Sequence, residues 1–243
     1  MQVSFLLHVR FTVVRSKKST SQDTIPLQKA LKEACLKTNE ELLYSSIETQ
    51  HSGTTAVLVV IRGTSMLCAN VGDSRAVLGK KNGKSWLAIP LSKDHKPNDP
   101  IEKTRIEING GKVEPFRNSE GNLIGPSRVW KAGERSPGLA MSRSLGDFEA
   151  KQVGVVPDPE ITEFRVAAAD KFLIIGSDGL WDAVSNIEAV QIVGEAWEAG
   201  SPDLAVDKLT KKAVREWKKH DFIVDDITVV VVFLREYPKY NSL

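Results

Sequence analysis

Two acidic side chains follow an apolar run in the segment FLIIGSDGLWDAV, where Asp178 ends the run and Asp182 lies four residues later. Other acids occupy similar settings, at points where a β-rich stretch meets a turn. Asp73 follows CANVG, and Asp225 and Asp226 precede ITVVVVFL. Carboxylate oxygens are the ligands that Mg²⁺ and Mn²⁺ prefer. If these strand ends converge, they build a site for a divalent cation.

Such a cluster depends on a counter-charge. Two carboxylates about 4 Å apart repel each other by roughly 4 kcal/mol at an effective dielectric constant of 20. The alternative interpretation is local, because an aspartate in GDS is typical of a turn and Asp182 stands near a helix start, where it would act as a cap. Spacing alone leaves both interpretations open.

The remaining reactive residue types give weaker signals. His51, His95 and His220 have no ligand-like neighbours, and we expect each in a loop or at the surface. The sequence contains no GxSxG, P-loop or GxGxxG motif. A phosphohydrolase with an aspartate nucleophile would carry a second acid two residues after the first. The spacing of four between Asp178 and Asp182 disfavours that class.

Composition places the chain among globular proteins. Of its 243 residues, 41% are hydrophobic and 26% are charged, which argues against disorder, and a net charge of +2 is too small to indicate nucleic acid or membrane binding. Cys35 and Cys68 lie in apolar surroundings without a partner motif, so we expect reduced core thiols. We therefore expect a cytoplasmic protein, with the nucleus as a second compartment. Residues 1–22 contain no acid and leave organelle targeting open.

The first third of the chain has one helical and several extended patterns. Apolar residues fall on one helix face over 27–42, and Pro26 suits the first helical position. The runs TTAVLVVI, SMLCANV, SRAVLGKK and KSWLAIPL then predict short strands, which we interpret as an antiparallel meander. Asn82-Gly83 favours a tight hairpin. Period-two alternation predicts a further strand over residues 3–13.

Residues 94–150 differ from the rest, because they are rich in proline, glycine and charge. One short helix is predicted at 100–108. Long irregular segments are uncommon unless they serve a function. We interpret this stretch as a flap or a loosely packed excursion.

The C-terminal third is predicted to contain two consecutive helices between two strands. KFLIIGS predicts a strand, and Ser185 with Glu188 forms a capping box for a helix that ends near Gly200. A second helix should begin at Pro202 and reach about Lys219. The last strand, DITVVVVFL, is apolar on both faces and is predicted to be central. Grouped helices and antiparallel strands indicate a layered α+β fold.

Several motifs occur together in one order: SGTTAV, ANVGDSRAVL, LSKDHKP, GGKV, PGLAMSRSLGD, VVPDPEI, SDGLWD and DDITVVVV. In this order they resemble the metal-dependent protein serine/threonine phosphatases of the PP2C (PPM) family, over roughly Leu27 to Leu234. The resemblance implies an αββα sandwich, in which two antiparallel sheets pack face to face with helices outside. It also implies a binuclear Mg²⁺ or Mn²⁺ centre, phosphoserine and phosphothreonine proteins as substrates, and a monomer.

The resemblance assigns roles residue by residue. Asp178 and Asp225 correspond to ligands of the binuclear centre, whereas Asp73 and Asp182 correspond to ligands of a weaker third metal. Asp226 stands where the family usually has asparagine. The stretch 94–150 looks like the family's flap beside the active site.

Two family motifs are missing from the sequence. One is an arginine followed by Glu-Asp, held to bind the substrate phosphate, and the other is DGHGG, which holds a metal-bridging aspartate and the proposed general acid. No catalytic residue is therefore identifiable. We interpret 1–26 as an atypical segment and 27–243 as an N-terminally incomplete phosphatase domain, whose sheet gap the strand at 3–13 could fill.

The missing motifs leave two functional interpretations. Loss of a general acid typically costs on the order of 10²- to 10⁴-fold in rate, and loss of the bridging carboxylate should cost more. We expect hydrolysis of a phosphopeptide or p-nitrophenyl phosphate by this chain to be very low. The chain is either a protein phosphatase by lineage or a catalytically inactive relative that acts as a binding or regulatory module.

Overall fold

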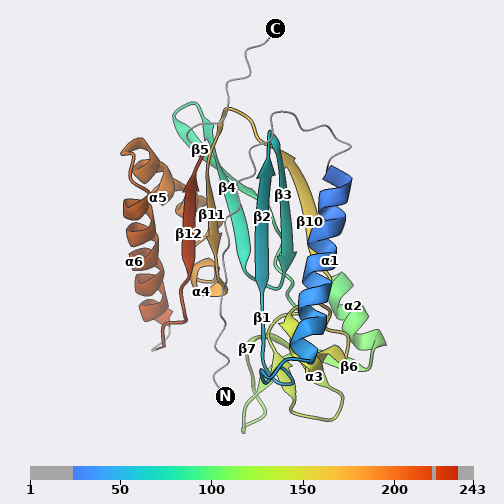
Figure 1. The fold of residues 1–243 in the computed structure, drawn as a ribbon. Coiled ribbons are helices and arrows are strands. Elements are labelled where there is room, and N and C mark those ends of the chain that lie inside the picture. Colours follow the sequence, from blue (N-terminus) through green and yellow to red (C-terminus); the bar gives the residue numbers. More distant parts are fainter. Residues whose placement is uncertain (1–23, 221–222, 235–243) are drawn as a thin grey trace.

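The computed structural model describes residues 24–220 and 223–234. Its centre is a sandwich of two antiparallel sheets with helices on both outer faces (Figure 1). The first sheet has the order β10-β3-β2, with bounds Glu160–Arg165, Ser65–Val71 and Ala56–Arg62. The second has the order β12-β11-β4-β5, with bounds Val229–Phe233, Asp170–Gly176, Arg75–Asn82 and Ser85–Pro90. The predicted α+β sandwich is confirmed.

Side-chain alternation explains how the layers form. In β11, Phe172 and Ile174 belong to the apolar cluster under the helices, whereas Leu173 and Ile175 belong to the cluster between the two sheets. Successive side chains of a strand point to opposite faces, so an apolar run fills both layers only when both faces are covered. The sequence of β11 thus requires a partner on each side.

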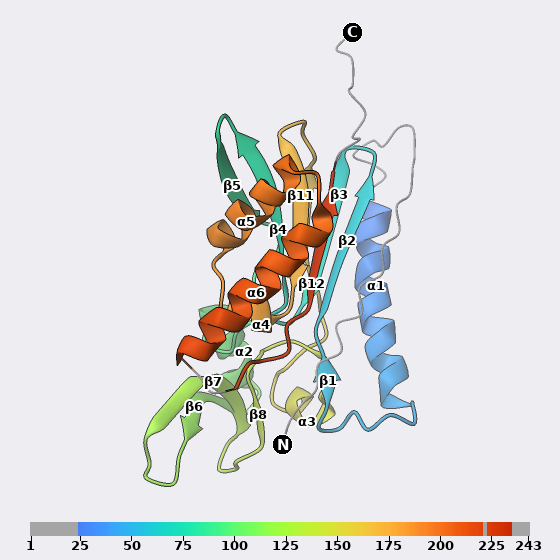
Figure 2. The same cartoon turned by 90° about the vertical axis from the view of Figure 1, so that its left-hand side faces the viewer.

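The helices cover the two outer faces. On the first sheet lies α1, Thr24–Leu43, where Leu31 packs with Leu67 and Ala69. On the second sheet lie α5 and α6, Asn186–Glu198 and Pro202–His220 (Figure 2). The capping box predicted for Ser185 and Glu188 is confirmed.

The flap-like stretch gathers at one end of the sandwich in Figures 1 and 2. The helix predicted at 100–108 is confirmed as α2, Pro100–Ile108. The segment after it folds into a three-stranded sheet that the sequence did not predict, with bounds β6 Gly111–Arg117, β7 Leu123–Lys131 and β8 Pro137–Leu139. Shorter elements complete this end: β1 Gly53–Thr54 pairs with β9 Leu145–Gly146, and α3 spans Phe148–Lys151.

Two predictions about strand order are wrong. The early strands do not form one meander, because β3 and β4 lie in different sheets. Gly72, with φ +102°, turns the chain between them in a conformation that other residues rarely adopt. The final strand is not central either, since β12 pairs only with β11 within the described part of the chain. Its two apolar faces are explained by the helices on one side and the first sheet on the other.

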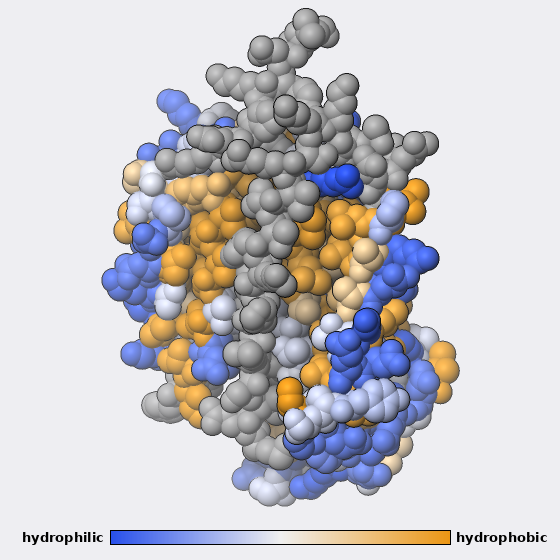
Figure 3. All heavy atoms as spheres, viewed as in Figure 1, coloured by the Kyte–Doolittle hydropathy of each residue, from blue (hydrophilic) through white to orange (hydrophobic). Residues whose placement is uncertain are grey.

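Other predictions concern the surface and the termini. Figure 3 shows hydrophobic residues gathered over β12 and β2 on the face seen in Figure 1. Cys35 and Cys68 are free and buried, as predicted, and burial raises their pKa values to about 11 and about 12.

Within residues 24–220 and 223–234, no helix has the length and apolarity that a membrane crossing needs. The strand predicted for 3–13 lies outside the described residues.

Candidate metal centre

Asp178 and Asp182 lie at the two ends of one helical turn. β11 ends at Gly176, and the one-turn helix α4, Asp178–Trp181, follows Ser177 directly. The backbone N–H of Asp182 donates to the carbonyl of Asp178 at 2.8 Å. Residues four apart lie on the same side of a helical turn, so the spacing noted in the sequence places both carboxylates on one face.

A buried tryptophan holds this turn against the sheet. The indole N–H of Trp181 lies within hydrogen-bonding distance of two backbone carbonyls, at 3.1 Å from that of Arg75 in β4 and 3.0 Å from that of Gly176 in β11. Trp181 and Leu180 are both buried. The position of Asp178 is therefore fixed by the hydrophobic core beneath it, which is what a ligand on a rigid element requires.

Asp225 lies beside Asp178 because β12 pairs with β11. The pairing ends at Gly176 and Val229, and beyond it the N–H of Ser177 donates to the carbonyl of Thr228 at 3.1 Å. Each acid also accepts a hydrogen bond from the next backbone N–H, at 3.0 Å for Asp178 and 2.8 Å for Asp225. The sheet thus brings together two residues that the sequence separates widely.

Asp73 reaches the same region from the other sheet. It lies in the turn between β3 and β4, and Arg75, two residues later, is paired with Gly176. Asp73 is 2% exposed, and its carboxylate accepts a hydrogen bond of 2.6 Å from the ammonium of Lys96. Lys96 was not predicted to take part in the site, although it belongs to the LSKDHKP motif.

The electrostatics of the group favours a cation. Burial, together with the neighbouring carboxylates of Asp73 and Asp225, raises the pKa of Asp178 to about 7, against the opposing effect of the Lys96 ammonium. Burial also raises the pKa of Asp73, with Lys96 opposing. A buried carboxyl that resists ionisation beside other acids has too little positive charge around it. The donors are hard oxygens, so in chemistry they fit Mg²⁺ or Mn²⁺.

The charges of these carboxylates favour a cation, but their side chains are not arranged as a metal site. Asp182 and Asp225 are exposed, whereas Asp73 is buried and bound to Lys96. In the part of the chain that the structure describes, no three carboxylate, imidazole or thiol groups form a cluster that could hold a metal ion. The assignment of Asp178, Asp225, Asp73 and Asp182 as metal ligands stays a prediction.

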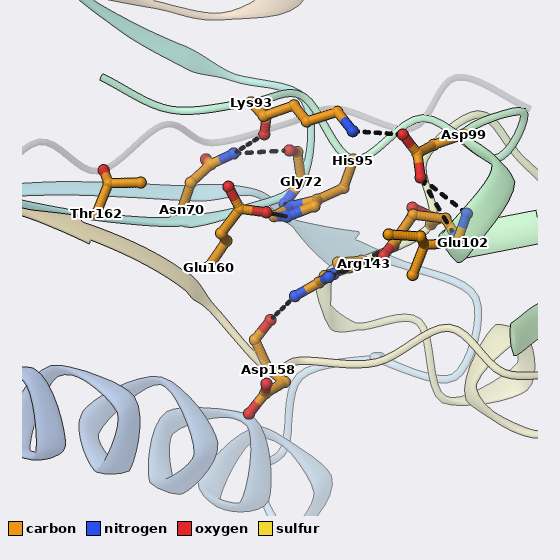
Figure 4. Close-up of polar contacts among 12 residues, drawn as sticks. Asn70, Gly72, Lys93, His95, Asp99, Glu102, Arg143, Asp158, Glu160 and Thr162 are labelled. Carbon is orange, nitrogen blue, oxygen red and sulfur yellow. Dashed lines mark hydrogen bonds and ion pairs between the residues drawn. The ribbon is translucent and has the colours of Figure 1, made fainter. Parts of the chain in front are cut away.

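One of the histidines is buried beside the turn that carries Asp73. His95 lies in a loop, as expected, but it is 2% exposed and therefore not at the surface. Its ring Nδ1 accepts a hydrogen bond of 3.1 Å from the backbone N–H of Gly72 (Figure 4). The contact with Gly72 could not be predicted from the sequence, because the residues around His95 are polar and typical of a surface loop. The ring Nδ1 of His51, by contrast, lies 2.7 Å from the carboxylate of Glu149, and the His51 side chain is 54% exposed.

A buried acid joins separate parts of the flap-like stretch 94–150. Glu102 of α2 accepts hydrogen bonds from Arg105 at 2.7 and 2.8 Å, from Arg143 at 2.8 Å and from the hydroxyl of Ser142 at 2.6 Å. Burial alone would raise the pKa of Glu102, but these donors outweigh burial and hold the pKa well below its usual range. Figure 4 shows Arg143 between Glu102 and the backbone carbonyl of Asp158.

Comparison with known proteins yields a consistent set of relatives. A family model described as Protein phosphatase 2C matches residues 4–221. The chain is 40% identical over 223 residues to "Probable protein phosphatase 2C 73" of Arabidopsis thaliana and 41% identical over 198 residues to "Probable protein phosphatase 2C 12" of Oryza sativa subsp. japonica. These matches cover 90% and 80% of this chain but only 58% and 49% of the relatives, so the chain spans about half their length.

A solved structure gives the same picture in three dimensions. The fold is similar to the crystal structure of serine-threonine phosphatase 2C from Toxoplasma gondii, with a TM-score of 0.74 and 25% sequence identity. The match covers 90% of this chain and 72% of that one. A protein described as a C. elegans sex determining protein shares the fold, with a TM-score of 0.64.

Proposed function

Because the chain belongs to the protein phosphatase 2C family, we propose that it is a metal-dependent protein serine/threonine phosphatase domain. Its substrates would be phosphoserine and phosphothreonine proteins, hydrolysed by water. The observation that carries this proposal is the proximity of Asp178 to Asp225 and to the buried Asp73, which contributes to raising the pKa of Asp178 to about 7. A divalent cation bound among these carboxylates would reduce the repulsion between them.

The proposed roles follow from where each acid is held. Asp178 and Asp225 would hold one ion between adjacent strand ends, and Asp73 with Asp182 would hold a neighbouring ion. A bound Mg²⁺ or Mn²⁺ supplies Lewis acidity, which activates water for attack on phosphorus and stabilises the leaving oxygen. The chain's own contribution is to fix the carboxylates by the β11–β12 pairing and by the buried Trp181.

The flap offers a place for the polypeptide part of a substrate. A pocket of about 150 Å³ lies in the β6–β7 region, where the ring centroids of Phe116 and Trp130 are 6.3 Å apart. Basic and acidic side chains line it together, and Glu114 pairs with both Lys112, at 2.8 Å, and Arg117, at 3.6 Å. The exposed aromatic surface and the mixed charges suit contact with the polypeptide around a phosphorylated residue.

A second candidate function is a binding module without catalysis. It is favoured by the observation that, among the described residues, no three donor groups form a ready metal cluster. Such a protein would use the flap and the sheets to bind phosphoproteins or partner surfaces without hydrolysing them.

A metal titration combined with an activity assay separates the two candidates. We would titrate the chain with Mn²⁺ by calorimetry and measure hydrolysis of a phosphothreonine peptide, for the wild type and for Asp178→Ala. Mn²⁺-dependent hydrolysis that Asp178→Ala abolishes supports the phosphatase, even at a low rate. Peptide binding without any hydrolysis at saturating Mn²⁺ supports the binding module.

A further inference from the structure

Three consecutive residues of one loop hold the turn that carries Asp73. Asp94 accepts two hydrogen bonds from the guanidinium of Arg75, at 2.8 and 2.7 Å. Lys96 donates to the carboxylate of Asp73 at 2.6 Å. Between them, His95 contacts the backbone of Gly72. Each residue of the loop segment 94–96 therefore contacts a different residue at this turn. The three side chains are of three different chemical kinds.

His95 makes two hydrogen bonds to the backbone of Gly72. Its backbone N–H donates to the carbonyl of Gly72 at 3.0 Å, and its ring Nδ1 accepts from the N–H of Gly72 at 3.1 Å. The carbonyl of Gly72 also accepts from the side chain of Asn70 at 3.0 Å (Figure 4). Every polar backbone atom of Gly72 is thus engaged, and the ring of His95 supplies the acceptor for its N–H.

The other side of Gly72 is closed by packing. An added Cβ at this position would clash with the side chain of Thr55, and φ is +102°. The hydroxyl of Thr55 is in turn 2.8 Å from that of Ser74, the residue after Asp73. With Thr55 on one side and His95 on the other, the turn has little freedom to shift.

The protonation state of His95 suits this role. Burial, followed by the charge of Arg143, lowers the pKa of His95 to about 4. The ring is therefore neutral near pH 7, and because Nδ1 accepts from Gly72, the proton resides on Nε2. The nearest acid to Nε2 is Glu160, at 3.8 Å, which is beyond hydrogen-bonding distance.

We propose that His95 is a positioning residue, which fixes Gly72 through its ring Nδ1 and thereby aims the carboxylate of Asp73 at the region of Asp178. This inference rests on the proposed metal-dependent function. Groups that orient metal ligands without touching the metal typically contribute 10- to 100-fold to metal affinity. The alternative is that His95 only fills space in a buried loop.

Two substitutions of similar size separate positioning from packing. His95→Asn places a side-chain oxygen near the position of Nδ1 and keeps an acceptor for Gly72, whereas His95→Leu has nearly the same shape and no acceptor. We expect His95→Leu to weaken Mn²⁺ binding, measured by calorimetry, by about tenfold. His95→Asn should stay within about threefold of the wild type, since one neutral hydrogen bond is retained.

Hydrogen exchange adds a measurement that needs neither metal nor activity. In the wild type the N–H of Gly72 should exchange slowly compared with that of the turn glycine Gly83. It should exchange at least about tenfold faster in His95→Leu but not in His95→Asn. Circular dichroism and thermal unfolding of both variants verify that they fold.

The outcomes distinguish this inference from the proposed function. Equal Mn²⁺ affinities of the two variants, or fast exchange at Gly72 in the wild type, would overturn the positioning role. If the wild type binds no Mn²⁺ but Gly72 shows the expected exchange pattern, His95 positions the turn and the metal-dependent function fails instead.

Discussion

The hydroxyl of Ser177 donates a hydrogen bond of 3.0 Å to the backbone carbonyl of Asp226. The same hydroxyl accepts from the backbone N–H of Thr228 at 3.1 Å. Ser177 precedes Asp178, and Asp226 follows Asp225, so one side chain ties together the backbones of the two predicted ligands. Their separation is set by this bridge and by β-sheet pairing, without any metal.

Gly179 should be intolerant of any side chain, because an added Cβ would clash with the backbone carbonyl of Asp226. We expect Gly179→Ala to push the segment of Asp225 away, to lower the free energy of unfolding by about 1–3 kcal/mol and to weaken Mn²⁺ binding. Urea denaturation and calorimetry measure the two effects. Gly194→Ala is the matched control, since its Cβ would clash with Trp86 far from the site and should cost stability alone. Equal metal affinities in both variants would contradict the prediction.

Asp178 should make the metal-free protein less stable as the pH rises. Its pKa is raised to about 7, so the folded state binds a proton that the unfolded state releases near pH 4, and stability falls between these values. Asp178→Asn is expected to raise the free energy of unfolding at pH 8 by about 1–3 kcal/mol and to remove stabilisation by Mn²⁺. Thermal unfolding at pH 5 and pH 8, with and without Mn²⁺, measures both.

Asp226→Asn provides the control for this experiment. Asp226 is an exposed neighbour of Asp225, and its carboxylate stands where the family usually has an amide. It should leave both the pH profile and the response to Mn²⁺ close to the wild type. A destabilised Asp178→Asn at pH 8 would refute the electrostatic argument.

Lys96 should contribute most to the stability of the fold when no metal is bound. Removing its ammonium leaves the buried carboxylate of Asp73 without its ion-pair partner, so Lys96→Met is expected to cost about 2–3 kcal/mol at pH 8. Added Mn²⁺ should restore part of the loss. A double-mutant cycle with Asp73→Asn isolates the pair energy. Lys93→Met, which removes a 63% exposed cation paired with Asp99, should have a much smaller effect.

Glu102 should account for part of the protein's sensitivity to acid. Its pKa is held well below the usual range by Arg105, Arg143 and Ser142 against the effect of burial, so its stabilising contribution is present above about pH 4.5 and is lost as the pH falls. Glu102→Gln should cost about 3 kcal/mol at pH 7 and flatten the acid limb of the stability curve. Glu107→Gln, on the exposed side of the same helix, should change neither. An unchanged acid limb in Glu102→Gln would disprove this account.

Local sequence signals predicted the elements well. The capping box at Ser185, the Asn82-Gly83 hairpin and the helix at 100–108 all depend on residues within a few positions of one another, so their physics is readable in a short window. The convergence of Asp178 and Asp225 was only one of two open interpretations of the sequence, because it depends on β11 and β12 pairing as neighbours.

Features set by distant contacts were not predictable. The passage from β3 to β4 between sheets depends on which face each strand buries, and a short window does not contain that information. The sheet of β6, β7 and β8 was not predicted, because glycine, proline and charged residues interrupt the alternation of apolar and polar residues in its strands. His95 and Lys96 looked like loop residues, and only the turn at Gly72 gives them partners. The motif LSKDHKP was the one available signal for them.

The turn at Asp73 joins the two sheets, whereas Asp178 follows β11 and Asp225 precedes β12, both strands of the second sheet. We expect the span between Asp73 and the other two acids to depend in part on how this turn packs against the apolar layer between the sheets, which includes Met66 and Leu78. Substitutions that thicken or thin this layer should change the spacing of the predicted ligands from a distance. If the proposed metal site forms, side-chain volume in the core should therefore affect its preference between ions of different radius, with every predicted ligand left in place.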